Sequence, residues 1–287
     1  MAAWRIGAAR DGRGAGVMTT ASADVRDEVV EVCDGRLHLH VKVAGDGPPV
    51  VFFHPLPGLE WQPFLDRLAE RHTVYAPEHP GTSPGEPQAI REVHTFWELL
   101  LAYEEALRVL GLERPPVIGM SYGGMVAADL AASFPDSLSR LVLLSPIGLW
   151  RDDVPIRLVE MVTGPPEELP GYLFRHPESE AARAMMALPD DPDQIPKAIA
   201  QTAWNIGCTT KFAWPIADHG LARRLHRISV PTLVLWGRDD ALIPVAYAEE
   251  FAQRINGSRL EVLEDCGHVM QSDQPERMWG LVAEFLG

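Results

Sequence analysis

A serine between two glycines is the first residue whose surroundings indicate chemistry. The chain contains one G-x-S-x-G run, GMSYG at residues 119–123, which follows the apolar stretch 115–120 and opens the small-residue stretch 122–134. A turn between a strand and a helix needs small residues around the serine, because its backbone is strained and closely approached there. The pattern predicts that Ser121 is a nucleophile presented at the end of a strand.

A serine hydroxyl becomes a good nucleophile only when a neighbouring base removes its proton. Among the ten histidines we choose His268, which lies in the loop EDCGHVMQSDQPE between the last predicted strand and the final predicted helix. A carboxylate must then orient the imidazole. Two adjacent candidates, Asp239 and Asp240, follow the predicted strand 231–237 and compete for this role.

The segments that must position these residues alternate between strand and helix patterns. EVVEV (28–32) and RLHLHVKV (36–43) flank an Asp-Gly turn and predict a hairpin. After the hairpin, short apolar runs predict buried strands at 48–54, 72–77, 115–120, 139–146, 231–237 and 258–265. Helices are predicted at 61–71, 95–110, 122–134, 245–255 and 274–286. This alternation predicts an α/β fold with a mostly parallel, twisted sheet covered by helices on both faces.

The alternation stops between about residues 147 and 227. Strand patterns vanish there, prolines cluster, and short helical patterns such as ESEAARAMMAL and PKAIAQTAW appear. We expect a flexible N-terminal tail at 1–27, an α/β core formed by 28–146 and 228–287, and a helical cap at 147–227. Three basic residues near the end of the cap are expected on a solvated helix face: Arg223, Arg224 and Arg227.

The serine turn, the acid loop, the histidine loop and the loop HPLPG (54–58) stand in the order typical of the α/β-hydrolase superfamily, which the chain resembles from about residue 28 to residue 286. The run GRDDALIP (237–244) is similar to the family pattern G-x-x-D-x-x-x-P, and this selects Asp240 as the acid. The resemblance implies a triad of Ser121, His268 and Asp240, and a cap inserted after the sixth strand.

The resemblance also implies an oxyanion hole built from two backbone N–H groups. They map to Tyr122, which follows the nucleophile, and to Leu56 in the loop HPLPG. This loop looks like the family's H-G-x-P-G, but Pro55 stands where the first glycine usually stands. Proline has no N–H, so Pro55 cannot donate, while Leu56 can. His54 is expected to pack under the loop.

Composition excludes several other classes of protein. Twenty-five Lys and Arg against 40 Asp and Glu give a formal net charge of −15, which repels nucleic acids and anionic membrane surfaces. We therefore expect a small-molecule substrate, and neither nucleic acid nor a membrane as a partner. The sequence has no HExxH, no P-loop and no glycine fingerprint after a strand, so no metal or cofactor is predicted. Three cysteines without a CxxC pair, and an N-terminal segment without a long apolar run, favour a cytoplasmic location.

The leading hypothesis is hydrolysis of a small, largely apolar carboxylic ester through an acyl-enzyme intermediate. Ser121 argues against the epoxide hydrolases and haloalkane dehalogenases of this fold, which carry aspartate at the same position. Carbon–carbon bond hydrolysis of the meta-cleavage product type, perhydrolysis and a non-catalytic receptor role stay open as alternatives. Four aromatic side chains of the cap are candidates for an apolar substrate pocket over Ser121: Trp150, Trp204, Phe212 and Trp214.

Overall fold

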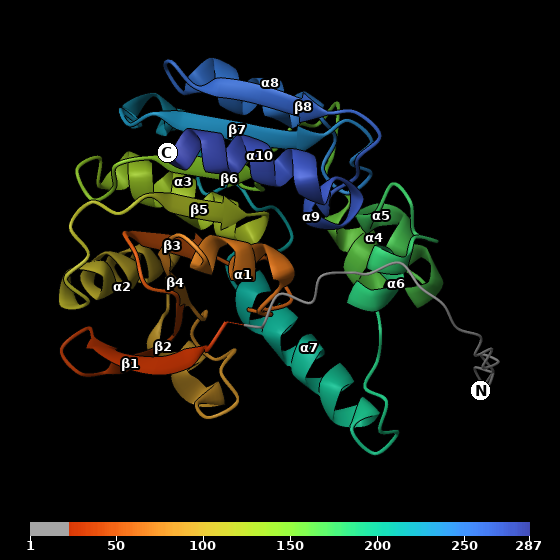
Figure 1. The fold of residues 1–287 in the computed structure, drawn as a ribbon, viewed down its shortest axis with the longest axis horizontal. Coiled ribbons are helices and arrows are strands. Elements are labelled where there is room, and N and C mark those ends of the chain that lie inside the picture. The colour runs from red at the N-terminus through yellow and green to blue at the C-terminus, as the bar shows by residue number, and fades with distance from the viewer. Residues whose placement is uncertain (1–22) are drawn as a thin grey trace.

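The computed structural model describes residues 23–287, and within this part of the chain the strands form one eight-stranded sheet (Figure 1). The strands are β1 (Arg26–Val32), β2 (Leu37–Ala44), β3 (Pro49–Phe53), β4 (Thr73–Pro77), β5 (Val117–Met120), β6 (Leu141–Leu144), β7 (Thr232–Gly237) and β8 (Arg259–Leu263). Their order is β1-β2-β4-β3-β5-β6-β7-β8. β2 is antiparallel to both β1 and β4, and all other neighbours are parallel. The predicted α/β fold with a mostly parallel sheet is confirmed.

The central strands are buried on both faces, as their continuous apolar sequences require. Every residue of β5, β6 and β7 is buried. β5 lies between β3 and β6, where Gly119 pairs with Phe53 on one side and with Leu143 on the other. The strand that leads to Ser121 is therefore held in the middle of the sheet.

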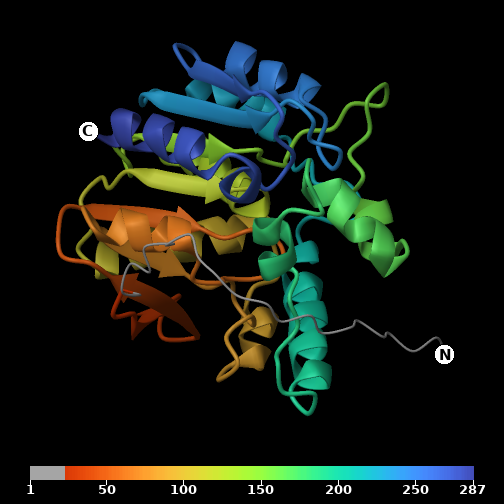
Figure 2. The same ribbon diagram turned by 45° about the vertical axis from the view of Figure 1, so that its right-hand side comes forward.

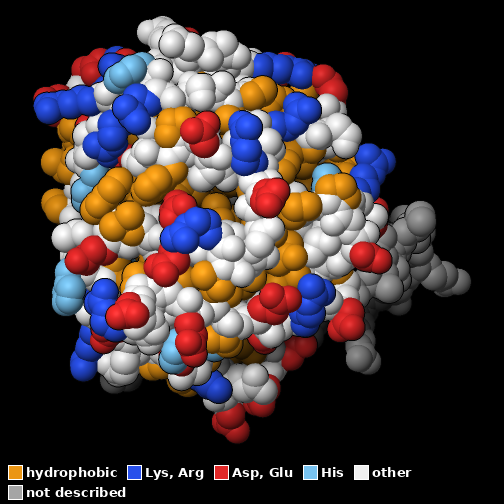
Figure 3. Space-filling view, turned by 90° about the vertical axis from the view of Figure 1, so that its left-hand side faces the viewer, with side chains coloured by type: hydrophobic (Ala, Val, Ile, Leu, Met, Phe, Trp, Pro, Cys, Tyr) orange, Lys and Arg blue, Asp and Glu red, His pale blue; other side chains and the backbone are white. Residues whose placement is uncertain are grey.

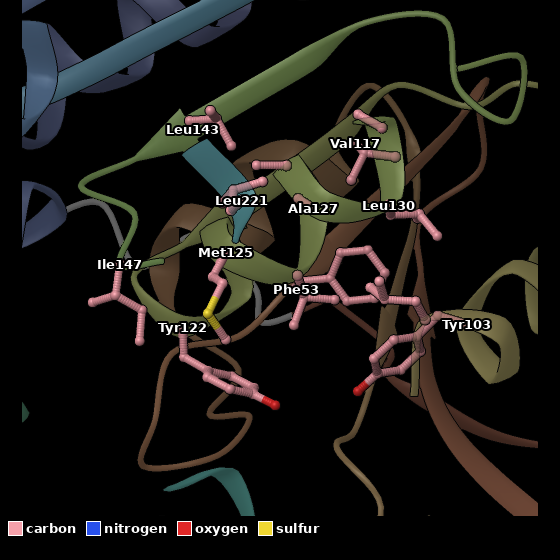
Figure 4. Close-up of a cluster of buried hydrophobic side chains, with 14 of the residues drawn as sticks. Phe53, Tyr103, Val117, Tyr122, Met125, Ala127, Leu130, Leu143, Ile147 and Leu221 are labelled. Carbon is pink, nitrogen blue, oxygen red and sulfur yellow. The ribbon is translucent and has the colours of Figure 1, made fainter. Parts of the chain in front are cut away.

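Helices cover both faces of the sheet and form a separate apolar core on each. One core contains side chains from α2 (Phe96–Val109), α3 (Tyr122–Ser133) and α8 (Ala246–Arg254). The other contains side chains from α1 (Pro63–Ala69), α9 (Met270–Asp273) and α10 (Pro275–Leu286). Figure 4 shows part of the first core, where Tyr122 and Met125 of α3 lie near Phe53 of β3 and Tyr103 of α2. The helix that follows Ser121 is thus packed directly on the sheet.

The segment between β6 and β7 is helical. It contains α4 (Leu158–Thr163), α5 (Leu169–Leu173), α6 (Glu180–Met185), α7 (Ile195–Thr210) and the short 3₁₀ turns η2 (Pro166–Glu168), η3 (Leu221–Arg223) and η4 (Leu225–Arg227). Figures 1 and 2 place helices α4 to α7 at the end of the sheet toward which the parallel strands point. One further 3₁₀ turn, η1 (Pro87–Glu92), lies between β4 and α2. We refer to residues 147–227 as the cap segment.

The expected solvated face at the end of the cap segment is correct for Arg223 and Arg227, which are exposed, and wrong for Arg224, which is partly buried. Arg224 makes a two-pronged ion pair with the buried carboxylate of Asp129 on α3, at 2.8 and 2.6 Å. Arg227 Nε donates a hydrogen bond of 2.8 Å to the carbonyl of Ala132. Both side chains are long enough to reach across to α3, so they fasten the cap segment to the helix that carries the serine turn.

A flexible tail is predicted at residues 1–27. Residues 1–22 of this range lie outside the described part of the chain. From there on the chain contacts the core, because the amide of Ala23 donates a hydrogen bond of 3.0 Å to Asp66 Oδ1. Strand β1 begins at Arg26, before the predicted start at Glu28.

Charged side chains of both signs are intermixed with apolar ones on the face of the molecule shown in Figure 3. Among residues 23–287, no helix is both long enough and apolar enough to cross a membrane.

Candidate active site

Ser121 lies in a sharp turn between β5 and α3, with a φ of +52° and a ψ of −113°. Such a conformation is strained for a residue with a side chain. The glycines on either side are required by close backbone contacts. A Cβ atom on Gly119 would lie 2.4 Å from the carbonyl oxygen of Gly123, and one on Gly123 would lie 2.1 Å from that of Phe53. The G-x-S-x-G spacing is therefore what this turn demands.

The end of β6 braces the serine turn from the other side. The Ser121 amide donates to the carbonyl of Leu144 at 2.9 Å, and the Ser121 carbonyl accepts from the amide of Ile147 at 3.1 Å. The backbone of the serine is thus held at both its N–H and its C=O, and this fixes where its hydroxyl can lie.

Asp240 and His268 form a buried pair. The Nδ1 atom of His268 lies 2.8 Å from Asp240 Oδ2, and the two residues are 3% and 5% exposed, respectively. The other carboxylate oxygen, Oδ1, accepts from the amides of Leu242 at 3.0 Å and Ile243 at 2.8 Å. A carboxylate held in this way keeps the proton on Nδ1 and leaves the lone pair on Nε2.

Asp239 points elsewhere. Its carboxylate is 40% exposed and lies 3.4 Å from the guanidinium of Arg175. Of the two competing carboxylates, Asp240 is the one that faces the imidazole.

Ser121, Asp240 and His268 follow β5, β7 and β8, whose carboxyl ends lie at one edge of the sheet. Within residues 23–287, neither Ser121 Oγ nor His268 Nε2 makes a hydrogen bond, to each other or to another group. Hydrogen bonds between catalytic groups are often long without substrate and shorten when it binds. The structure therefore pairs the histidine with the aspartate and places the serine at the same edge.

The two amides expected to form the oxyanion hole belong to buried residues. Leu56 is 2% and Tyr122 is 1% exposed, and in the described part of the chain neither amide donates a hydrogen bond. The cap segment holds the loop that carries Leu56. Thr209 Oγ1 donates to the Leu56 carbonyl at 2.9 Å, and Asn205 Nδ2 donates to the Pro57 carbonyl at 2.9 Å. Helix α7 thus fixes the loop by its carbonyl groups and leaves the Leu56 N–H available.

Two buried histidines lie under this loop. His54 Nδ1 donates to the Pro55 carbonyl at 2.7 Å, and His54 Nε2 accepts from the amide of His79 at 2.9 Å. Because burial disfavours the charged imidazolium, the pKa of His54 is lowered to about 4, and burial also lowers the pKa of His79. His79 is not among the residues predicted from the sequence, and its one sequence signal is the polar loop EHPGTSPG after β4.

His79 also reaches the residue after the nucleophile. Its Nδ1 atom lies 3.4 Å from the hydroxyl of Tyr122. Burial raises the pKa of Tyr122 and of Tyr103, so both phenols stay protonated. Figure 4 shows these two hydroxyl groups directed toward each other. The loop of Leu56 and the side chain of Tyr122 are therefore joined through two neutral imidazoles.

The four aromatic candidates for a substrate pocket lie in different surroundings. Phe212 is 4% exposed, and its ring centroid lies 5.9 Å from that of His79. Trp204 and Trp214 are 44% and 41% exposed, and the indole N–H of Trp204 donates to the carbonyl of Gly81 at 2.8 Å. The indole N–H of Trp150 donates to Asp152. Phe212 is thus the candidate with direct packing against a residue that contacts Tyr122.

Comparison with known proteins agrees with the observed fold. Residues 48–275 match the family model described as the alpha/beta hydrolase fold. The chain is 26% identical to a 2-hydroxy-6-oxo-6-phenylhexa-2,4-dienoate hydrolase of Comamonas testosteroni, over 86% of this chain and 91% of that protein. It is 28% identical to a pimeloyl-[acyl-carrier protein] methyl ester esterase of Aeromonas hydrophila, over 88% of this chain and the full length of that protein.

A solved structure with the same fold is that of a membrane phospholipase A described as a bacterial virulence factor. It superposes with a TM-score of 0.73 at 23% identity, over 91% of this chain and 86% of that chain. The family match spans most of the chain and includes the serine turn, the acid loop and the histidine loop. The chain belongs to the α/β-hydrolase fold family.

Proposed function

We propose that this protein is a serine hydrolase that cleaves a small, largely apolar carboxylic ester through an acyl-enzyme intermediate on Ser121. The observation that carries the proposal is the buried Asp240–His268 pair, which lies at the same sheet edge as the strained turn of Ser121. A neutral imidazole with its lone pair on Nε2 is the group that a serine nucleophile needs as its base.

Acylation starts when His268 Nε2 takes the proton of Ser121 Oγ while Oγ attacks the ester carbonyl carbon. The carbonyl oxygen becomes negatively charged and is stabilised by the N–H groups of Leu56 and Tyr122. The bond between the carbonyl carbon and the alcohol oxygen then breaks. His268 gives its proton to this oxygen, so the alcohol leaves and the acyl group stays on Ser121.

Deacylation repeats the same steps with water. His268 takes a proton from the water molecule, whose oxygen attacks the acyl carbon. When the bond to Ser121 Oγ breaks, the proton on His268 returns to this oxygen and the carboxylic acid leaves. Asp240 stabilises the imidazolium that forms in each half of the reaction.

The preference for an apolar and uncharged substrate is supported by the residues around the turn. Phe212 packs beside His79, and helix α7 covers the loop of Leu56 with few charged groups. The net charge of −15 disfavours a polyanionic substrate. Aligned relatives include one named a methyl ester esterase, which is in line with ester chemistry.

The replacement Ser121→Ala tests the proposal. We expect turnover of short p-nitrophenyl esters to fall by roughly 10⁴-fold or more, because loss of the nucleophile removes the covalent route. A fluorophosphonate probe should label the unmodified protein once per chain and leave the Ser121→Ala variant unlabelled.

Ser145→Ala is the matched control, since Ser145 directly follows β6, is fully buried and has no side-chain hydrogen bond in the described residues. This variant should keep both activity and labelling. Near-normal ester turnover by Ser121→Ala would contradict the proposal.

Carbon–carbon bond hydrolysis is a second candidate, favoured by the similarity to a 2-hydroxy-6-oxo-6-phenylhexa-2,4-dienoate hydrolase. The same triad would act on a ketone carbonyl in that reaction. Parallel assays of this dienoate and of p-nitrophenyl esters, each at equal concentration, separate the two. A kcat/KM for the dienoate above that for every ester would replace the ester proposal.

A further inference from the structure

The loop that carries His268 is held against the cap segment on both sides of the histidine. The amide of Val269 donates directly to the carbonyl of Leu173 at 2.9 Å. The amide of Gly267 donates to Asp273 Oδ2 at 2.8 Å, and the amide of Arg175 donates to this same oxygen at 2.8 Å. One carboxylate oxygen therefore joins the residue before His268 to the cap segment.

Gly267 lets the two backbones come this close. A Cβ atom at this position would lie 2.7 Å from the Arg175 amide nitrogen and 3.0 Å from the Leu173 carbonyl oxygen. Residues 173–175 thus run in direct contact with the histidine loop. Any shift of this stretch moves the backbone from which the imidazole extends.

Asp273 is itself well anchored. It is the last residue of the short helix α9, and its own amide donates to the Val269 carbonyl at 3.2 Å. Its second oxygen, Oδ1, is buried and has no hydrogen-bond partner within residues 23–287. The hydrogen bonding of this carboxylate is therefore concentrated on the two amides, and hydrogen bonds to a charged acceptor are stronger than neutral ones.

Ion pairs between side chains lie close to the hydrogen bonds of Asp273, and these side chains are more exposed to solvent. Arg175 Nε lies 3.4 Å from both Asp239 Oδ2 and Asp265 Oδ1, and His176 Nε2 lies 2.8 Å from Asp265 Oδ2. The side chains of Arg175, His176 and Asp265 are about half exposed, and exposed pairs of this kind contribute little to stability. The backbone contacts held by Asp273 are the ones that constrain His268.

We propose that Asp273 is a positioning residue of the active site, which fixes His268 for proton transfer by binding the amides of Gly267 and Arg175 together. The inference rests on the proposed function, because it assigns Asp273 a role through the general base. It also makes the docking of residues 173–175 a condition for full activity.

The test compares Asp273→Ala, Asp273→Asn and Asp265→Asn with the unmodified protein on a short p-nitrophenyl ester. We expect Asp273→Ala to lower kcat by about 10- to 100-fold with KM unchanged within about twofold, since small misplacements of a catalytic group cost this much. Asp273→Asn keeps an oxygen that can accept from both amides and should restore kcat to within about fivefold of the unmodified protein. Asp265→Asn removes only exposed ion pairs at a position with a φ of +54°, which asparagine tolerates, and should keep kcat within about twofold.

Three results overturn the inference: an unchanged kcat in Asp273→Ala, a loss that appears in KM alone, and a loss that Asp273→Asn does not reverse. If Asp273→Ala does not fold, Asp273→Ser, whose side chain is too short to bridge both amides, takes its place. Failure of both to fold also rejects the inference, because the residue then acts on folding. Fluorophosphonate labelling of the unmodified protein at Ser121 separates these results from a failure of the proposed function, under which no such labelling occurs and the inference falls as well.

Discussion

Asp239 and Asp240 are consecutive carboxylates whose surroundings give them different tasks. Asp240 is buried, accepts two backbone hydrogen bonds on one oxygen and faces His268 with the other. Asp239 is 40% exposed and pairs with Arg175 at the surface. Both residues are aspartates, so the same replacement at each position shows how much the location of the carboxylate matters for activity.

Asp240→Asn should lower kcat by roughly 10⁴-fold, because an amide at this position no longer holds the imidazole in the tautomer with its lone pair on Nε2. Asp239→Asn should change kcat by no more than about twofold, since an exposed ion pair contributes little. Steady-state kinetics on one ester measures both. An equal loss of kcat in the two variants would contradict the proposal that Asp240, and not Asp239, orients His268.

At the residue scale, much of the site could be predicted from the sequence. The serine turn has a motif with a steric cause, and the order of serine, aspartate and histidine follows the strand order. The choice between Asp239 and Asp240 needed the family pattern, because spacing alone does not tell which of two neighbours faces inward. His79 and Asp273 could not be found, because each acts through a hydrogen bond whose partner is known only from the fold.

Helix α7 is the element that holds the loop of Leu56, the proposed oxyanion-hole residue, in place. Side chains on this helix donate to carbonyl groups of the loops that follow β3 and β4: Gln201, Trp204, Asn205 and Thr209. Asn205 also packs against Gly58, where a Cβ atom would lie 2.5 Å from the asparagine amide nitrogen. The helix therefore matches the shape of the loop that carries Leu56.

Thr209→Val should lower kcat by about 3- to 10-fold, because the Leu56 carbonyl loses its hydrogen bond and the adjacent amides are less well fixed, at a cost of about 1 kcal/mol. Thr210→Val is the neighbouring control. The Thr210 hydroxyl bonds carbonyl groups of its own helix, so this variant should retain kcat within about twofold. A loss that is as large for Thr210→Val would assign the effect to helix stability.

The boundaries of the core strands and helices can be predicted from the local pattern of apolar residues. The position of the cap segment on the core cannot. The alternating hairpin and the buried strands lie close to their predicted ranges because hydrophobic periodicity reports burial directly. Helices α4, α5 and α6 are short and have few buried residues, so their sequences show little periodicity. Local sequence pattern also does not reveal distant partners. Arg224 was expected in solvent because its partner, Asp129, is 95 positions away in the chain.

Across the whole molecule, the fold carries buried histidines that make its stability depend on pH. His54 keeps its two hydrogen bonds only as a neutral imidazole, and burial lowers its pKa from 6.5 to about 4. The unfolded chain binds a proton at His54 below pH 6.5, whereas the folded chain does so only near pH 4. The free energy of unfolding should therefore fall as the pH drops from 6.5 toward 4, by about 3 kcal/mol for this residue.

Urea unfolding at several pH values between 4.5 and 7.5 measures this effect. His54→Gln removes one of the two buried histidines and should make the pH dependence less steep, even where it lowers stability at pH 7. His226→Gln, at an exposed histidine, should leave the slope unchanged. An equal slope in the unmodified protein and His54→Gln would contradict a neutral, buried His54.

The central claim is that Ser121 carries the acyl group during turnover. Rapid acid quenching of the protein during hydrolysis of p-nitrophenyl acetate, followed by peptide mapping by mass spectrometry, measures this directly. We predict an acetyl group on the peptide that contains Ser121, located on that serine by fragmentation and absent from Ser121→Ala. Turnover of the ester with the acetyl group on another residue, or with no covalent intermediate under conditions where deacylation is slow, would contradict the account.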